Sequence, residues 1–285
     1  MRVLEFVIDE EYSNRKLYSF LRRNVQLSLR LVRRLKTLPE GILCNGVPIR
    51  TVDIVKKGDV ITLNLPEDNV NITPCELMPD VVYEDSDLLI VNKPPMLPIH
   101  ESHNHQGDTL QNSVSAYLMK KGINCAFRAI GRLDKGTSGL VVCALNSHTA
   151  SRLSGNIEKE YLAVATGIYE GEGTIDAPIY RPDPMKTYRT VDERGDRAVT
   201  HWKAVERIGN CTLLKIRLET GRTHQIRVHF AHLGTALFGD TMYGCVSEKL
   251  CHQALHCHKV SLVHPVTQKE IVCVTEPPWN KEIFE

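Results

Sequence analysis

The spacing of apolar residues along positions 1–64 predicts a small unit of two helices and several short strands. Three leucines recur every four residues, which is the period of one buried helix face: Leu27, Leu31 and Leu35. An apolar group over 17–21 indicates a shorter helix before this one. The dipeptide Asn45-Gly46 separates two apolar runs and predicts a hairpin, because both residues tolerate the positive φ of a tight turn.

Residues 65–79 interrupt this pattern. They are polar, show no sustained periodicity and contain three prolines: Pro66, Pro74 and Pro79. We therefore expect a linker at 65–79 between a small unit at 1–64 and a larger one at 80–285.

In the larger unit, strand-like runs outnumber helical ones. Strands are expected over 81–85, 88–92, 159–167, 198–206, 211–218, 255–262 and 271–274, and helices over 109–120 and 147–159. Strands joined by short turns pair antiparallel. The predicted fold is α+β, with a mixed, mostly antiparallel sheet preceded by a small α/β unit.

The composition of the 285 residues, 42% of them hydrophobic, is that of a globular protein. Because the net charge is only +1, any nucleic-acid binding must come from a local basic patch. No apolar run is long enough for a membrane span, and the N-terminus lacks the pattern of a signal peptide. Nine cysteines without a C-x-x-C pair indicate free thiols, so we expect a cytoplasmic protein, and we expect it to be a monomer.

A basic face is predicted on the second helix of the small unit. Arg30, Arg33 and Arg34 have the i, i+3, i+4 spacing of one helix face. Such a face can follow the phosphates of a nucleic acid, although most charge runs are only solvated helix surfaces.

One loop gathers charged residues and glycines directly before a strand-like run. In the stretch 131–140 (GRLDKGTSGL), the single carboxylate of Asp134 lies between Arg132 and Lys135. A loop anchored on a rigid strand is a usual position for catalytic residues. The residues alone leave two interpretations open, a catalytic carboxylate and a solvated turn with an incidental aspartate.

A second stretch, 220–230 (TGRTHQIRVHF), predicts a helix with cationic residues at its start. Thr220 or Thr223 is expected to cap this helix, and Arg222 and Ile226 are expected one turn apart on it.

Two groups of histidines and cysteines, at 100–105 and 251–258, lack the spacing of a closed structural zinc site, so we expect no metal. We also expect neither a phosphate-binding loop nor a paired-carboxylate metal site, which disfavours a nucleotide hydrolase.

Three stretches together resemble the RluA-type pseudouridine synthases. Residues 132–140 match the R-L-D-x-x-T-S-G-L signature, and 220–229 match T-G-R-x-H-Q-[IL]-R-V-H. Residues 159–167 match K-x-Y-x-A-x-V-x-G, with Ala165 at one variable position. A fourth segment resembles N-K-P-x-G, but Met96 replaces its glycine.

The small unit is similar to the αL RNA-binding module first known from a ribosomal small-subunit protein. The similarity lies in its order: two helices, an Asn-Gly turn, and a Gly-Asp turn leading into a strand.

The resemblance implies the pseudouridine synthase fold and the isomerisation of uridine to pseudouridine in RNA, with ribosomal RNA favoured over transfer RNA. It implies that Asp134 attacks the ribose or acts on it as a base, that Tyr161 is the candidate for late proton transfer, and that Arg227 pairs with Asp134. An adjacent guanidinium keeps such a carboxylate ionised. Arg132 and Arg222 would hold phosphates, and this chemistry requires neither cofactor nor metal. The alternative is a catalytically silent RNA-binding protein that assists ribosome assembly.

Overall fold

The N-terminal residues enclose a hydrophobic core of their own. The computed structural model of the chain describes residues 2–66, 73 and 75–285. A four-stranded antiparallel sheet has the order β1 (Arg2–Val7), β6 (Val60–Leu65), β3 (Ile42–Cys44) and β4 (Val47–Pro48). The short strands β2 (Arg15–Lys16) and β5 (Ile54–Val55) pair beside it. The predicted hairpin is confirmed, since Asn45 and Gly46 have φ of 50° and 82° between β3 and β4.

Two helices pack on this sheet, α1 (Leu17–Arg23) and α2 (Leu29–Lys36). The Ser28 hydroxyl caps α2 by accepting the Leu31 N–H at 3.1 Å. Leu31 and Leu35 are buried as the periodicity predicted, and Leu27 is buried just ahead of the helix. The opposite face of α2 exposes three arginines, Arg30, Arg33 and Arg34.

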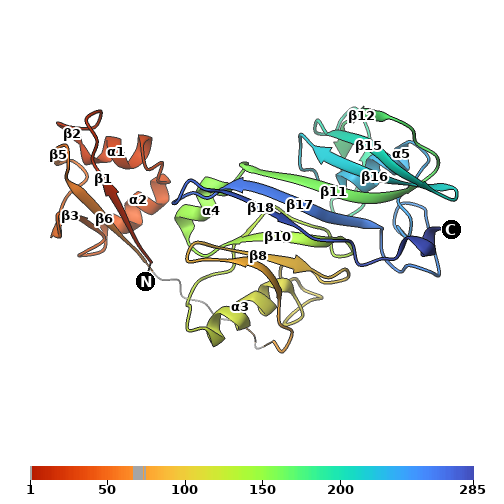
Figure 1. Cartoon of the computed structure of the whole chain (residues 1–285), viewed down its shortest axis with the longest axis horizontal. Helices are drawn as coiled ribbons and strands as arrows, with labels where there is room; N and C mark the ends of the chain where they lie inside the picture. The colour runs from red at the N-terminus through yellow and green to blue at the C-terminus, as the bar shows by residue number, and fades with distance from the viewer. Residues whose placement is uncertain (1, 67–72, 74) are drawn as a thin grey trace.

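The larger unit is built on one long sheet, and the predicted α+β, mostly antiparallel fold is confirmed (Figure 1). Its strand order is β12-β15-β16-β11-β17-β10-β8-β7, with β18 beside β17 and β9 beside β10. The strands are β7 (Asp80–Glu84), β8 (Leu88–Lys93), β9 (Ala129–Ile130), β10 (Ser138–Ala144), β11 (Ile157–Thr166), β12 (Glu172–Asp176), β15 (Val199–Ile208), β16 (Cys211–Leu218), β17 (Leu255–Val263) and β18 (Glu270–Val274). Among the described strand pairs of this sheet, β10 and β17 run parallel and the others antiparallel.

Side-chain alternation on β11 divides the sheet into two faces. Tyr161, Ala163 and Ala165 point into the main core, as predicted from their period of two. Leu162 and Val164 point to the other face, into a smaller cluster with Trp279 and Phe284 near the C-terminus. The 3-10 helix η1 (Lys281–Phe284) brings Phe284 there.

Three α-helices complete the larger unit: α3 (Leu110–Lys120), α4 (Ser147–Leu153) and α5 (Gln225–His232). The predicted helix over 147–159 was too long, and the Asn146 side chain caps its start. Gly155, at φ 80°, turns the chain out of α4. Residues 157–159 then pair with β17, because their ladder to residues 260–262 outweighs their local helix propensity.

The N-terminal unit lies at one end of the elongated molecule, beside α4, as Figure 1 shows. The Arg2 guanidinium donates to both carboxylate oxygens of Asp87, at 2.9 and 2.6 Å, and the Arg152 side chain contacts Gln26. Val266 packs against the N-terminal core. A small hairpin, β13 (Ile179–Tyr180) with β14 (Thr190–Val191), stands apart from the long sheet. Among the described residues, no helix has the length and apolarity needed to cross a membrane.

Candidate active site

Asp134 lines a small open cleft between its glycine-rich loop and the start of α5, and we call this the Asp134 cleft. Its side chain is 25% exposed, so solvent and a ligand can reach it. The four other predicted residues that line the same cleft are Arg132, Tyr161, Arg222 and Arg227. Three more predicted residues, Arg30, Arg33 and Arg34, lie instead on α2 in the N-terminal unit.

Glycine allows the strand after this loop to approach its neighbour. Gly139 has φ 108°, and a Cβ atom there would lie 2.4 Å from the Cys257 carbonyl oxygen. Only glycine therefore permits β10 to run so close to β17. On the other side of β17, Tyr161 of β11 pairs with Cys257. Cys257 therefore lies between β10, which follows the Asp134 loop, and β11, which carries Tyr161.

Arg227 lies between two carboxylates. Its Nη1 donates to Asp134 Oδ2 at 3.0 Å, while its Nε and Nη2 donate to Asp240 at 2.7 and 2.9 Å. The Arg227 and Asp240 side chains are only 7% and 1% exposed. Burial alone would lower the pKa of Arg227, but hydrogen bonding to Asp240 and the charges of both acids outweigh it and raise that pKa.

Asp240 was missed as a site residue by reasoning from sequence. Its position after Gly239 in a turn was visible, but nothing in the chain indicated which cation it would bind. The bidentate geometry fixes the plane of the Arg227 guanidinium, and this leaves one N–H group directed at Asp134.

His224 also faces the cleft, and it had no predicted role. The Tyr243 hydroxyl accepts the Arg189 N–H at 3.0 Å and lies within hydrogen-bond distance, 2.9 Å, of His224 Nδ1. The other ring nitrogen, Nε2, lies 3.9 Å from Asp134 Oδ2. Burial lowers the pKa of His224, so the ring is neutral at neutral pH.

The start of α5 differs from the prediction. His224, at φ 59°, occupies the N-cap, and neither Thr220 nor Thr223 caps the helix. The Thr220 hydroxyl instead bonds the Gln225 side chain, at 2.9 Å. Arg222 precedes the helix, where its Nε donates to the Arg197 carbonyl at 3.1 Å, so it does not share a helical turn with Ile226.

Tyr161 forms a buried wall of the Asp134 cleft, with 7% of its surface exposed. Burial, and the neighbouring Cys257 and Asp134, raise the pKa of its hydroxyl well above 10. The hydroxyl is therefore protonated at neutral pH.

Lys93, the last residue of β8, is hydrogen-bonded to the Asp134 loop. Its side chain is fully buried, and its Nζ donates to the carbonyls of Pro94 and Leu97 at 2.9 Å each and of Lys135 at 3.1 Å. The last bond ties β8 to the residue next to Asp134. Between Pro94 and Leu97, Met96 adopts φ 63° at the position where the family pattern has glycine. Burial lowers the pKa of Lys93 to about 7, against the opposing charge of Asp134.

This burial predicts a measurable pH dependence of stability. Between pH 7 and 9 the unfolded chain keeps the Lys93 proton while the folded chain releases it, so stability rises with pH. From pH 7 to 9, the free energy of unfolding of the wild type should increase by about 2 kcal/mol more than that of Lys93→Met. Urea unfolding of both proteins at the two pH values measures this, and equal changes in the two proteins would contradict it.

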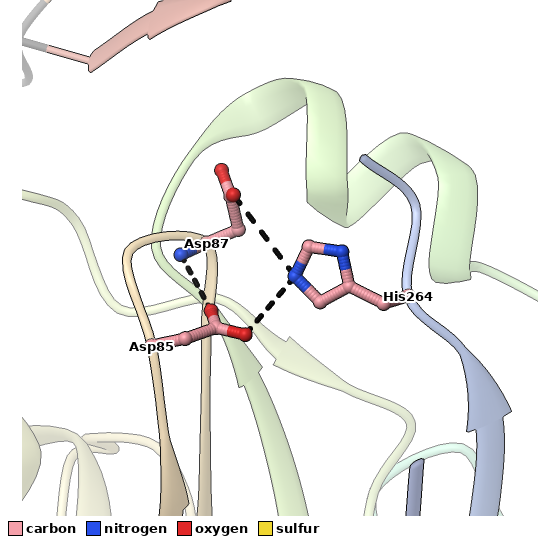
Figure 2. Close-up of side chains that lie close together, drawn as sticks. All are labelled: Asp85, Asp87 and His264. Carbon is pink, nitrogen blue, oxygen red and sulfur yellow. Dashed lines mark hydrogen bonds and ion pairs between the residues drawn. The ribbon is translucent and has the colours of Figure 1, made fainter. Parts of the chain in front are cut away.

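A group of possible metal ligands lies outside the Asp134 cleft, at the turn between β7 and β8. His264 Nε2 lies 3.0 Å from Asp85 and 4.0 Å from Asp87 (Figure 2). Asp85-Ser86-Asp87 is a paired-carboxylate pattern that the sequence reasoning overlooked.

The donor set of this group does not suit a metal ion. His264 Nδ1 accepts the N–H groups of Val266 and Thr267, at 3.1 and 2.9 Å, so the ring proton is on Nε2 and no lone pair there faces the acids. Asp87 already accepts both Arg2 and Asn146. The cluster instead joins the β7–β8 turn to β1 of the N-terminal unit.

Comparison with known proteins points to one family. The sequence model of the family described as "RNA pseudouridylate synthase" matches residues 87–232. The Bacillus subtilis protein named "Uncharacterized RNA pseudouridine synthase YhcT" is 37% identical over 300 residues, covering 99% of this chain and 95% of that protein. The Escherichia coli "Ribosomal large subunit pseudouridine synthase D" is 34% identical, covering 82% of this chain and 78% of that protein.

A solved structure agrees with the sequence comparisons. The structure titled "Human RNA Pseudouridylate Synthase Domain Containing 1" superposes with a TM-score of 0.59 at 27% identity. The match covers 72% of this chain and 86% of that one.

Proposed function

Because this chain belongs to the RluA-type family of RNA pseudouridine synthases and is an isomerase, we propose that it converts specific uridines of ribosomal RNA, with Asp134 as the catalytic carboxylate and without a cofactor. The observation that carries the proposal is the 3.0 Å contact of Asp134 with Arg227 in a cleft that a nucleotide can reach. Ribosomal RNA is favoured because a relative at 34% identity is named for it.

The reaction needs the target base outside its stack. An RNA loop or bulge presents such a uridine at the cost of a few kcal/mol for unstacking. Asp134 then attacks the anomeric carbon, or removes a sugar proton in a glycal route, as the bond from that carbon to the ring nitrogen breaks. The detached uracil rotates and bonds through its ring carbon to the anomeric carbon. As it does so, the bond from that carbon to Asp134 breaks or, in the glycal route, Asp134 returns the sugar proton. The ring carbon then loses the proton that it carried, and the ring nitrogen that left the sugar takes up a proton.

Arg227 and His224 prepare Asp134 for this step. The Arg227 guanidinium, held by Asp240, donates one N–H to the Asp134 carboxylate and so fixes its orientation. The neutral His224 ring lies beside the same oxygen, with Nε2 at 3.9 Å, and adds no full charge. Arg227 is therefore the cation that holds Asp134 in position for this step.

Tyr161 places an aromatic wall beside the everted base and is the candidate for the late proton transfer. Its raised pKa means that the hydroxyl begins the reaction protonated. It can accept the carbon-bound proton only as it gives up its own, so proton removal through Tyr161 requires an acceptor within the loaded cleft.

We assign the N-terminal unit, residues 1–64, to RNA binding, with the arginines of α2 as its phosphate contacts. Neutralising Arg30, Arg33 and Arg34 with glutamine should weaken RNA binding and reduce the slope of log Kd against log salt by about two. A control of equal charge replaces Arg50, Lys56 and Lys57, which lie in the same unit outside α2. Equal effects of the two triple variants would remove α2 from the interface.

The most direct test of the function is a map of pseudouridine in total RNA from cells with and without the gene. Loss of pseudouridine at defined positions of ribosomal RNA is expected when the gene is deleted. Identical maps would favour the catalytically silent RNA-binding protein, and losses confined to transfer RNA would correct the substrate.

A further inference from the structure

Beside the Asp134 cleft lies a second opening of about 420 Å³, which we call the arginine cleft. Four arginines line it, from the β13–β14 hairpin, the turn after β14 and the segment before α5: Arg181, Arg189, Arg194 and Arg222. Arg222 lines both clefts, so the two lie next to each other.

The positive charge of this cleft is only partly balanced. Arg194 pairs with Asp192 at 2.7 Å and Arg222 with Asp196 at 3.3 Å. Within the described chain, neither Arg181 nor Arg189 forms an ion pair with a carboxylate. Both donate to main-chain carbonyls of the hairpin loop instead, which anchors the side chains without cancelling their charge.

Several positively charged guanidinium groups lie close together around Arg189. Burial lowers the pKa of Arg189, and the nearby Arg181 and Arg132 lower it further. Arg132 comes from the Asp134 loop, two residues from the carboxylate. A bound anion would offset this repulsion, and planar guanidinium groups suit the oxygens of a phosphate.

Tyr243 connects the two clefts. Its hydroxyl links the Arg189 N–H to His224, and its ring lies 5.0 Å from the Arg227 guanidinium. Tyr188, which is 42% exposed, stacks on the same ring with centroids 5.2 Å apart. The hairpin loop is therefore held in a defined position relative to Asp134.

We propose that the arginine cleft binds the backbone phosphates of the RNA strand that continues from the everted uridine. This inference rests on the proposed function, since it takes the strand in the Asp134 cleft to be RNA. Cations spread from Arg132 through Arg189 to Arg181 suit consecutive phosphates of one strand better than the single phosphate of a mononucleotide.

Arg181→Gln tests this proposal, because the side chain is exposed and its loss leaves no buried group unpaired. Its affinity for an RNA stem–loop with unpaired uridines should fall about threefold to fivefold at 0.15 M KCl. The slope of log Kd against log salt should fall by about 0.7, the value for one phosphate contact of a single strand. Arg181→Lys should restore most of the affinity.

Arg207→Gln is the matched control, because Arg207 is also exposed and its Nε also donates to a main-chain carbonyl at 3.0 Å, outside both clefts. Unchanged affinity and salt slope in Arg181→Gln, or equal losses in both variants, would overturn the proposal. Competition by uridine monophosphate that depends on Arg181 would overturn it in favour of a mononucleotide site. A wild-type protein that forms no pseudouridine in total RNA would instead refute the proposed function, because the binding experiments do not depend on turnover.

Discussion

Replacing Asp134 with asparagine should abolish pseudouridine formation, with a loss of at least about 10³-fold in kcat. Asparagine keeps the shape of the side chain but removes the negative charge that either route of sugar chemistry needs. The cleft should keep its geometry, because Arg227 remains held by Asp240 and the loop remains tied to Lys93. RNA affinity should therefore stay within about twofold of the wild type, since aspartate repels rather than binds phosphates.

Turnover of unmodified ribosomal RNA by the purified variants, scored by pseudouridine content, measures this effect. Asp53→Asn is the control, because it removes one carboxylate, 33% exposed, from the N-terminal unit. It should leave kcat unchanged. An Asp134→Asn protein that retains a tenth or more of the wild-type rate would show that the essential carboxylate lies elsewhere.

Local sequence patterns predict those elements of this fold whose structure depends only on residues within the element. The Asn45-Gly46 hairpin and the alternating strand at Tyr161 formed as expected, because turn chemistry and a period of two act over a few residues. The contact between Asp134 and Arg227 joins positions 93 apart, and no local period encodes it. It was expected only because both stretches resemble one family.

The elements that the sequence did not predict depend on contacts between segments that are distant along the chain. Residues 157–159 became strand because β17 offered a partner, and α5 began late because Gln225 bonds Thr220 and the Arg222 N–H. Asp240 and Lys93 act through partners that the sequence does not specify. The same limit applies to Asp85 and Asp87, whose spacing is typical of a metal site although their partners in the fold are arginine, asparagine and histidine.

The second large effect is expected at Asp240, a positioning residue that acts through Arg227. Asp240→Asn leaves the Arg227 guanidinium buried with one of its two counter-charges, and it places an amide where two N–H donors need acceptors. Removing one member of such a buried pair costs about 3–5 kcal/mol of folding stability. Because Arg227 loses its fixed plane, kcat should also fall by about 10²-fold even in the folded fraction.

Comparison with the Arg50–Asp53 pair at the surface separates this effect from a general loss of charge. Asp53 accepts the Nε and Nη2 groups of Arg50, the same two groups that Asp240 accepts from Arg227, but at the surface. Asp53→Asn should therefore leave both unfolding and turnover nearly unchanged. Kd for RNA and kcat of Asp240→Asn are measured below its unfolding transition. If kcat is normal there while stability falls, Asp240 only supports the fold. If kcat falls with Kd unchanged, the direction of the Arg227 guanidinium limits the reactivity of Asp134.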